Sequence, residues 1–302
     1  MKKPVKFVHH SIHQKLLNLR DRANRPFNEL LQHFFIERFL YRLSQSKYQD
    51  RFILKGGLML KAWYGIEARP TKDIDMLARV NNSIDNLKNI VQEIIAVSVP
   101  NDGIVFDPDT IVGEEIRKDA EYLGVRIILK GRFDKIPVHI QIDLGFGDMV
   151  SPKPNWIDYP QLLDFGSPHL QAYSPETLIA EKYHAIAELG IFNTRMKDFF
   201  DIYFLAQNSN FFGEILASSI ATTFNTRSTT IPQNLPVAFL DTFYRDSEKL
   251  KQWKSFLDKS DLPFVDLEQL IELLVKFLMP ISKALANKQP FNLNWSPNNY
   301  WQ

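Results

Sequence analysis

Apolar side chains recur every three to four residues in two early segments, which predicts a pair of amphipathic helices at residues 11–22 and 27–46. The second segment, PFNELLQHFFIERFLYRLSQS, carries the denser apolar stripe and is expected to pack tightly. A short apolar run at 52–55 predicts a buried strand. The segment 58–65 predicts a helix that Gly65 ends, because glycine is the preferred residue just past a helix C-terminus.

The pattern then alternates between strand and helix periods. Residues 73–80 read as a strand, 83–97 as a helix, and 124–133 and 136–146 as two strands. The last of these alternates with a period of two, and the connection before it is only Asp134-Lys135, so an antiparallel hairpin is expected. Its apolar face holds Val138, Ile140, Ile142 and Leu144, and its polar face holds His139, Gln141 and Asp143.

The character of the chain changes near residue 151. The segments SPKPNWIDYP and FGSPH are rich in proline and predict a connection between domains. Residues 225–236 read as a polar loop and 291–302 as an irregular aromatic tail. The remaining segments have helix periodicity: 175–189, 194–207, 211–224, 238–258 and 266–286. The predicted fold class is α+β, with an N-terminal mixed-sheet domain (1–160, with N-terminal helices) followed by an all-α C-terminal domain (161–302).

Composition narrows the classes of protein that fit. The chain of 302 residues is 45% apolar and 24% charged and contains no cysteine, which excludes disulfides and cysteine-ligated zinc. No stretch approaches 18 consecutive apolar residues and no secretory signal is evident, so neither a membrane span nor export is expected. A cytoplasmic location is the expectation.

The net charge of +1 hides a basic N-terminus. Residues 1–25 hold seven Lys or Arg side chains against the single acid Asp21. Such an arm could lie along a phosphate backbone or an acidic partner, and a solvated terminal helix is the other interpretation.

Candidate chemistry begins with two aspartates on the strand that starts at residue 73. Side chains at i and i+2 of a strand point the same way, so Asp73 and Asp75 project together while Ile74 and Met76 face the core. Two carboxylates aimed at one point suit a divalent cation such as Mg²⁺. Asp143, on the polar face of its strand, is the candidate third carboxylate, and Asp148 is the reserve.

A phosphate site is expected nearby. The apolar run at 52–55 leads into Gly56-Gly57 and then into a helix, and the N–H groups at a helix N-terminus favour a phosphate. Arg69 and Thr71, in the loop before Asp73, could contact the phosphates as well, and a solvated loop is the alternative.

The strand, Gly-Gly turn and Asp-x-Asp order resembles the DNA polymerase β-like nucleotidyltransferase superfamily. More narrowly, LKGGLML, RPTKDIDM, ETLIAEKYHAIAE and NTRMKDFFDIY resemble the AbiEii/AbiGii family, the nucleotidyltransferase toxins of type IV toxin–antitoxin and abortive-infection systems. The resemblance covers roughly residues 30 to 280 and includes a PxxLP segment at Pro232–Pro236 and the pair Gln252-Trp253.

The resemblance implies roles for residues in both predicted domains. Gly56 and Gly57 match the phosphate-binding pair, and Asp73 and Asp75 match the metal-binding carboxylates. In the second motif block, Lys182 and Asp198 match residues regarded as part of the active site, and Arg195 matches a nucleotide-contacting position. Both sets are then expected to face one cleft. One departure is Leu58, which stands where the superfamily commonly has a hydroxyl residue.

The residues of this second block are also consistent with a structural role. Ser174 and Pro175 are typical of a helix start, as N-cap and first residue. Lys182 borders the apolar stripe of this helix, and such a lysine usually extends to solvent. Asp201, one turn after Asp198, reads as a structural ion pair or cap.

The expected activity is Mg²⁺-dependent transfer of a nucleotide from an NTP with release of pyrophosphate. Asp73, Asp75 and Asp143 are expected to hold one or two Mg²⁺ ions, and Gly56, Gly57 and Lys182 the phosphates. The resemblance implies the 3′ end of tRNA as acceptor and a cognate AbiEi-like antitoxin, acting as a transcriptional repressor, as partner. The alternatives are a small-molecule, antibiotic-type nucleotidyltransferase and a catalytically silent nucleotide-binding regulator.

Overall fold

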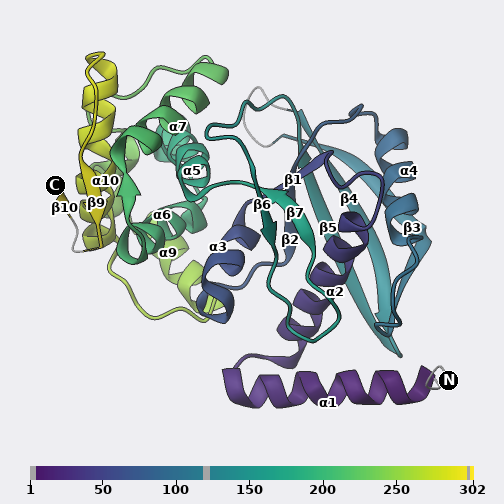
Figure 1. The fold of residues 1–302 in the computed structure, drawn as a ribbon. Coiled ribbons are helices and arrows are strands. Elements are labelled where there is room, and N and C mark those ends of the chain that lie inside the picture. The colour runs from purple at the N-terminus through teal and green to yellow at the C-terminus, as the bar shows by residue number, and fades with distance from the viewer. Residues whose placement is uncertain (1–4, 118–122, 298–299) are drawn as a thin grey trace. The chain divides into compact units, whose positions relative to one another are not determined.

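A mixed β-sheet organises the first part of the chain in the computed structural model, which describes residues 5–117, 123–297 and 300–302. Within these residues seven strands form the sheet, in the spatial order β3-β4-β5-β2-β1-β7-β6 (Figure 1). The strands are β1 (Phe52–Lys55), β2 (Asp73–Ala78), β3 (Ile104–Arg117), β4 (Leu123–Phe133), β5 (Ile136–Gly145), β6 (Asn155–Asp158) and β7 (His169–Ala172).

Strand β2 lies in the middle of this sheet. It pairs antiparallel with β1 and parallel with β5, and β4 and β5 form the predicted antiparallel hairpin. The sheet is therefore mixed, as the sequence predicts. The order places the central strand β2, which carries both candidate carboxylates, beside the strand that carries Asp143.

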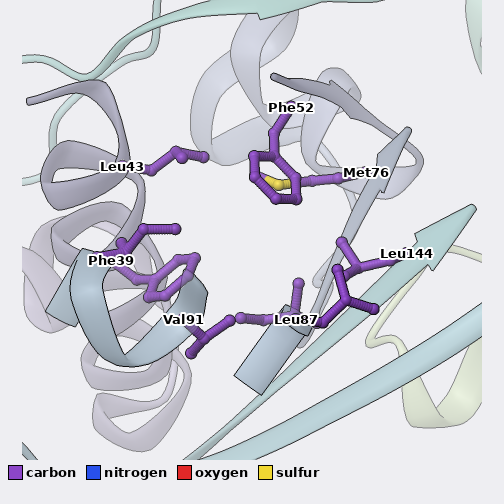
Figure 2. Close-up of a pocket in the computed structure, with 9 residues that line it drawn as sticks. Phe39, Leu43, Phe52, Met76, Leu87, Val91 and Leu144 are labelled. Carbon is purple, nitrogen blue, oxygen red and sulfur yellow. The ribbon is translucent and has the colours of Figure 1, made fainter. Parts of the chain in front are cut away.

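Helices α2 (Phe27–Ser44) and α4 (Ile84–Ile95) cover the apolar face of the sheet, and α1 (Val5–Ala23) packs on α2 (Figure 1). A small cavity of about 10 Å³ lies between the sheet and the helices α2 and α4. Its lining includes Phe39 and Leu43 of α2, Phe52 of β1 and Met76 of β2. Figure 2 shows these side chains directed toward one another, with only carbon and sulfur atoms on the labelled side chains. An apolar space of this size stays dry and belongs to the core.

Helix α3 (Gly57–Tyr64) connects β1 to β2 and contacts both strands. Its N-cap is Gly56 and its C-cap is Gly65, so a glycine flanks it at each end. The sequence predicted this helix and its glycine stop.

The chain after β7 is mainly helical. The N-cap of α5 (Pro175–Leu189) is Ser174, whose side chain accepts a hydrogen bond from the Thr177 backbone N–H at 3.2 Å, as the sequence predicts. Tyr183 and Phe224 are fully buried in the core of this part. The other helices are α6 (Met196–Asn208), α7 (Gly213–Thr226), α8 (Asp241–Tyr244), α9 (Ser247–Lys259) and α10 (Leu267–Ala286).

One predicted helix is two helices in the structure. The single helix expected at 238–258 is divided into α8 and α9, because the Asp246 side chain accepts hydrogen bonds from the backbone N–H groups of Glu248 and Lys249. This carboxylate caps α9 and so starts a new helix.

The C-terminal tail is not irregular. Strands β8 (Phe211–Phe212), β9 (Asn294–Ser296) and β10 (Tyr300–Trp301) form a small antiparallel sheet in the order β10-β9-β8. Trp295 on β9 is 1% exposed, and its indole N–H donates to the Ala206 carbonyl at 2.6 Å. The expectation of a purely helical second part is therefore corrected by this sheet.

The proline-rich connection also contains structure that the sequence did not predict. Residues 155–158 and 169–172 pair with each other as β6 and β7, and β7 adds to β1 in parallel. By contacts, the chain divides into two compact units, Met1–Gly147 with Asn155–Ala172, and Asp148–Pro154 with Tyr173–Gln302.

Candidate active site

Strand β2 positions the first two candidate residues. Asp73 and Asp75 are partly exposed, whereas Ile74 and Met76 between and after them are buried. The alternation follows from the strand period of two, which the sequence had predicted. The two carboxylates therefore share the face of the sheet opposite to the cavity of Figure 2.

Charged side chains form a row across this face. Asp75 is paired in register with Lys55 of β1 on one side and with Asp143 of β5 on the other. Asp143 is in turn paired with Arg126 of β4, and Arg126 with Glu114 of β3. Residues paired in this way point to the same face of a sheet, so the structure brings Asp73, Asp75 and Asp143 to one face.

Within this row Asp143 and Arg126 are in direct contact. Arg126 Nε donates to Asp143 Oδ1 at 2.8 Å, and Nη2 donates to Oδ2 at 3.0 Å. The hydrogen bonds that Arg126 donates to Asp143 raise the pKa of the Arg126 guanidinium above its ordinary value. The Gln141 amide also donates to Oδ1, at 3.3 Å. Asp143 is thus held by a bidentate ion pair, which fixes the plane of its carboxylate.

The Gly-Gly turn lies directly against these carboxylates. Gly56 has φ 71° and ψ −153°, a backbone conformation that is essentially restricted to glycine. A side chain at Gly56 would also collide with Asp75, since a Cβ there would lie 2.7 Å from Asp75 Cβ. The close approach of Gly56 to Asp75 explains why this turn needs a residue without a side chain.

Arg69 and Thr71 lie beside the start of helix α3. A Cβ at Gly57 would be 3.1 Å from the Thr71 hydroxyl and 3.2 Å from Arg69 Nη2. Arg69 is only 7% exposed, so this guanidinium is held in the protein rather than in solvent. The helix N-terminus, a hydroxyl and a cation therefore meet at Gly57, an arrangement that suits a phosphate group.

The donor set on β2 fits a divalent cation. Mg²⁺ is commonly held by one or two carboxylates plus the phosphates of a substrate, and Asp73 and Asp75 supply two on one strand face. Across the described residues, no group of three or more His, Asp or Glu side chains is arranged to hold a metal. Asp143 is in the right register for a third ligand, but Arg126 contacts both of its oxygens.

The second unit holds a separate buried ion cluster. Lys182 of α5, 6% exposed, has its Nζ 2.5 Å from Asp198 Oδ1 and 2.8 Å from Asp201 Oδ2. Arg195 Nε lies 2.7 Å from Asp198 Oδ2. The structure therefore brings together Lys182, Asp198 and Arg195, and Asp201 joins them.

Burial and charge act in opposite directions on Asp198. Burial by itself would raise the pKa of this carboxyl, but the charges of Lys182 and Arg195 outweigh it and lower the pKa to about 2. Asp198 is thus ionised throughout the neutral range, and the cluster pairs two cations with two carboxylates.

Asn193 shapes the turn that leads into α6. Its side-chain oxygen accepts from the Arg195 backbone N–H at 2.7 Å, and its backbone carbonyl accepts from Lys249 Nζ at 2.9 Å. Lys197 is exposed. In the NTRMKD segment, Asn193 therefore shapes the turn while Arg195 and Asp198 carry the charge.

The reserve candidate Asp148 has different surroundings. Its Oδ1 lies 3.6 Å from Arg227 Nη2, and Glu181 Oε1 lies 3.7 Å from the same nitrogen. Arg227 also donates to His184 Nδ1 at 3.2 Å, and burial, together with this cation, lowers the pKa of His184 to about 4. Asp148 belongs to this network in the second unit, whereas Asp143 is the carboxylate in register with Asp75.

Lys55 and Arg126 lie in the same row as these carboxylates, and the sequence pattern had not singled them out. The signal for Arg126 was present: alternation in VRIIL sets it opposite to the buried Val125 and Ile127, and a two-residue turn at Asp134-Lys135 fixes its register against Asp143. Lys55 is the only charged residue of β1, whose other residues are apolar. A charged residue at the end of such a buried strand was the signal that could have identified it.

Paired carboxylates on a central strand, next to a Gly-Gly turn at a helix N-terminus, are the arrangement expected of a nucleotidyltransferase. The profile of the family described as "Nucleotidyl transferase AbiEii toxin, Type IV TA system" matches residues 38–272. The chain therefore belongs to the AbiEii nucleotidyltransferase toxin family, as the sequence motifs indicated, and it is a nucleotidyltransferase.

Comparison with solved structures adds two proteins from Helicobacter pylori. JHP933 is 19% identical with a TM-score of 0.48, and the match covers 86% of this chain and 93% of that one. A protein described as a candidate nucleotidyltransferase is 18% identical with a TM-score of 0.49, and the match covers 87% and 97%. A comparison with curated proteins found no match.

Family membership implies an NTP substrate and an antitoxin partner. In the described part of the chain, no helix is both long enough and apolar enough to cross a bilayer.

Proposed function

We propose that this protein is an Mg²⁺-dependent toxin that transfers a nucleotide from an NTP to the 3′ end of tRNA in the cytoplasm. The observation that carries the proposal is the register of β1, β2 and β5, which gathers Asp73, Asp75 and Asp143 on one face beside the Gly56-Gly57 turn. Both aspartates of β2 lie opposite to Ile74 and Met76, which supply the packing on the apolar face of the sheet.

Each residue has a chemical task in this reaction. Asp73, Asp75 and Asp143 would hold the divalent cation, which supplies charge stabilisation at the reacting phosphates. The N–H groups at the start of α3, with Arg69 and Thr71, would bind the phosphates of the NTP. The acceptor hydroxyl oxygen bonds to the α-phosphorus, the bond to the β-phosphate oxygen breaks, and pyrophosphate leaves. Asp143 would accept the hydroxyl proton.

Residues of the second unit complete the proposal. On the family resemblance, Lys182 and Asp198 are proposed as active-site residues and Arg195 as a nucleotide contact. Their mutual ion pairs support a role in which Asp198 orients the two cations. The cognate antitoxin is proposed to act as a transcriptional repressor.

The basic first helix supports an RNA acceptor. Lys15, Arg20 and Arg22 on α1 are exposed, while Ile12 and Leu16 are buried. Exposed cations of this kind bind phosphate backbones in a salt-dependent manner, so labelling of RNA should weaken as salt increases.

The substitution Asp75→Asn tests the proposal. We expect the wild type with Mg²⁺, a labelled NTP and total tRNA to label RNA and release pyrophosphate, and the variant to do so roughly 100- to 1000-fold more slowly because one charge at the reacting phosphates is lost. The control is Asp158→Asn, an exposed carboxylate on β6 of the same sheet, which should keep full activity.

Circular dichroism and urea unfolding should show that Asp75→Asn still folds. Retained labelling by this variant would contradict the assignment of Asp75. Pyrophosphate release without RNA labelling would point to a small-molecule acceptor. NTP binding without release of pyrophosphate would point to a catalytically silent nucleotide-binding regulator.

A further inference from the structure

Arg126 contacts Asp143, the carboxylate that the proposed reaction uses to hold the divalent cation and to accept the hydroxyl proton. Its guanidinium engages both oxygens of Asp143, at 2.8 and 3.0 Å, in the planar two-bond geometry that arginine forms with carboxylates. In this arrangement the positive charge next to Asp143 is already supplied by the protein itself. A divalent cation at Asp143 would have to replace the guanidinium or share the carboxylate with it.

Sharing is unfavourable because two cations at one carboxylate repel each other. Replacement is feasible for two structural reasons. The Arg126 side chain is 30% exposed, so it can leave Asp143 and stay hydrated. Glu114, its neighbour on β3, has Oε1 3.7 Å from Arg126 Nη1 and can keep the guanidinium after it has left Asp143.

We infer that Arg126 is a positioning residue that holds Asp143 in the metal-free protein and competes with the divalent cation for this carboxylate. The inference rests on the proposed function, in which Asp143 is a ligand of that cation. It explains why Asp143 is in register with Asp75 although the three aspartates do not form a metal-binding group in this structure. In the absence of nucleotide, Arg126 thereby weakens binding of the divalent cation. It also keeps the Asp143 carboxylate oriented for binding that cation.

Binding of Mn²⁺ without nucleotide tests the inference, with free Mn²⁺ measured by electron paramagnetic resonance. Arg126→Lys is the informative variant, because it keeps the positive charge but loses the two-bond fork. We expect Arg126→Lys to bind Mn²⁺ roughly three- to tenfold more tightly than the wild type, as befits a partly exposed ion pair. Arg126→Gln should bind at least as tightly as Arg126→Lys.

The control is Arg132→Gln. Arg132 lies on the same strand and face as Arg126, about 20 Å further along β4 at roughly 3.4 Å per residue. That distance exceeds the screening length of about 10 Å at 0.1 M salt, so its removal should leave the Mn²⁺ affinity unchanged. An equal gain in Arg132→Gln would show that general charge, not the Asp143 pair, sets the affinity.

A double-mutant cycle with Asp143→Asn isolates the pair. If Arg126 acts through Asp143, the gain from Arg126→Lys disappears when Asp143 is Asn. Unchanged or weaker Mn²⁺ binding by Arg126→Lys overturns the inference, and so does a gain that persists in the Asp143→Asn background.

Asp75→Asn separates this inference from the proposed function. Loss of Mn²⁺ binding in Asp75→Asn and Asp143→Asn, with no effect of Arg126→Lys, would remove the role of Arg126 alone. Equal Mn²⁺ binding by wild type and Asp75→Asn, or no binding by any variant, would remove the proposed metal site and the inference with it.

Discussion

At the scale of single residues, Lys182 shows how burial changes the meaning of a sequence position. A lysine beside an apolar stripe usually extends to solvent, but Lys182 is 6% exposed and contacts Asp198 and Asp201. Removing one partner from a buried ion pair leaves an uncompensated charge, which costs far more than the pair itself contributes. The stability of the second unit therefore depends on all partners of this cluster being present, whatever the part of the cluster in catalysis.

The substitution Asp198→Asn should lower the free energy of unfolding by about 3 kcal/mol at pH 7, because Lys182 and Arg195 lose a buried carboxylate. Urea unfolding measures the change. The exposed Asp258 on α9 gives the matched control, Asp258→Asn, for which no change larger than about 0.5 kcal/mol is expected.

The pH dependence of stability follows from the same residue. Asp198 has its pKa lowered from 3.8 to about 2 in the folded protein, so the unfolded chain takes up its proton first as the pH falls. The contribution of Asp198 is therefore complete above about pH 4 and is lost between pH 4 and pH 2. Asp198→Asn should show a shallower loss of stability over this window, and an identical loss would contradict the assignment.

At the scale of elements, helix α3 depends on the two glycines that flank it. Gly56 and Gly65 both have positive φ, 71° and 60°. Only Gly56 is crowded, because a Cβ there would strike Asp75, whereas nothing lies within 4 Å of the corresponding position at Gly65. A comparison of the two glycines can thus separate the cost of a positive φ, which both share, from the cost of a collision with Asp75, which only Gly56 would have.

Gly56→Ala and Gly65→Ala together test this separation. Each should cost about 1–3 kcal/mol of stability through backbone strain. Gly56→Ala should cost at least about 1 kcal/mol more and should also reduce NTP turnover, because Asp75 must move. Equal unfolding free energies and equal activities of the two variants would show that the contact between Gly56 and Asp75 has no functional weight.

At the scale of the whole molecule, the last residues of the chain complete the core of the second unit. The Trp295 ring packs at a tilt against Phe277 of α10, with ring centroids 4.8 Å apart, and its indole N–H donates to the Ala206 carbonyl of α6. The small sheet of β8, β9 and β10 thereby ties the C-terminus to two helices that are distant in sequence.

Trp295→Ala should therefore destabilise the second unit by about 3–5 kcal/mol, through lost burial and the cavity left behind. Hydrogen exchange followed by mass spectrometry should show faster exchange in α6 and α10. The control is Trp156→Ala, since Trp156 is 45% exposed on β6 and its truncation should leave α6 and α10 protected. Unchanged protection in Trp295→Ala would mean that the tail packs without stabilising these helices.

Much of the fold could be predicted because strong periodicity gives a clear signal. Helices α2 and α5 and the hairpin of β4 and β5 match the sequence prediction within a few residues. Strand β3 escaped prediction because Pro108 interrupts its pattern, where the register of β3 and β4 shifts. An edge strand tolerates proline and a bulge, and the sequence alone does not show which strand lies at the edge.

Strands β6 and β7 escaped prediction for a related reason. Each has four residues in a proline-rich segment, and they become strands because β7 can pair with β1. Their order depends on a partner more than a hundred residues earlier in the chain, and local propensity carries no information about such a partner. The boundary expected between residues 160 and 161 stays a prediction.

The sequence by itself determined the helix and strand periods, the common face of Asp73 and Asp75, the glycine turn at Gly56-Gly57 and the family. These follow from local spacing, since the strand period of two and the needs of a tight turn act within a few residues. Only the tertiary structure decided which charges meet. Asp143 faces Arg126, and Lys182 lies between Asp198 and Asp201, because strand register and helix packing select partners far apart in sequence. The neighbouring cations then keep Asp198 ionised although it is buried.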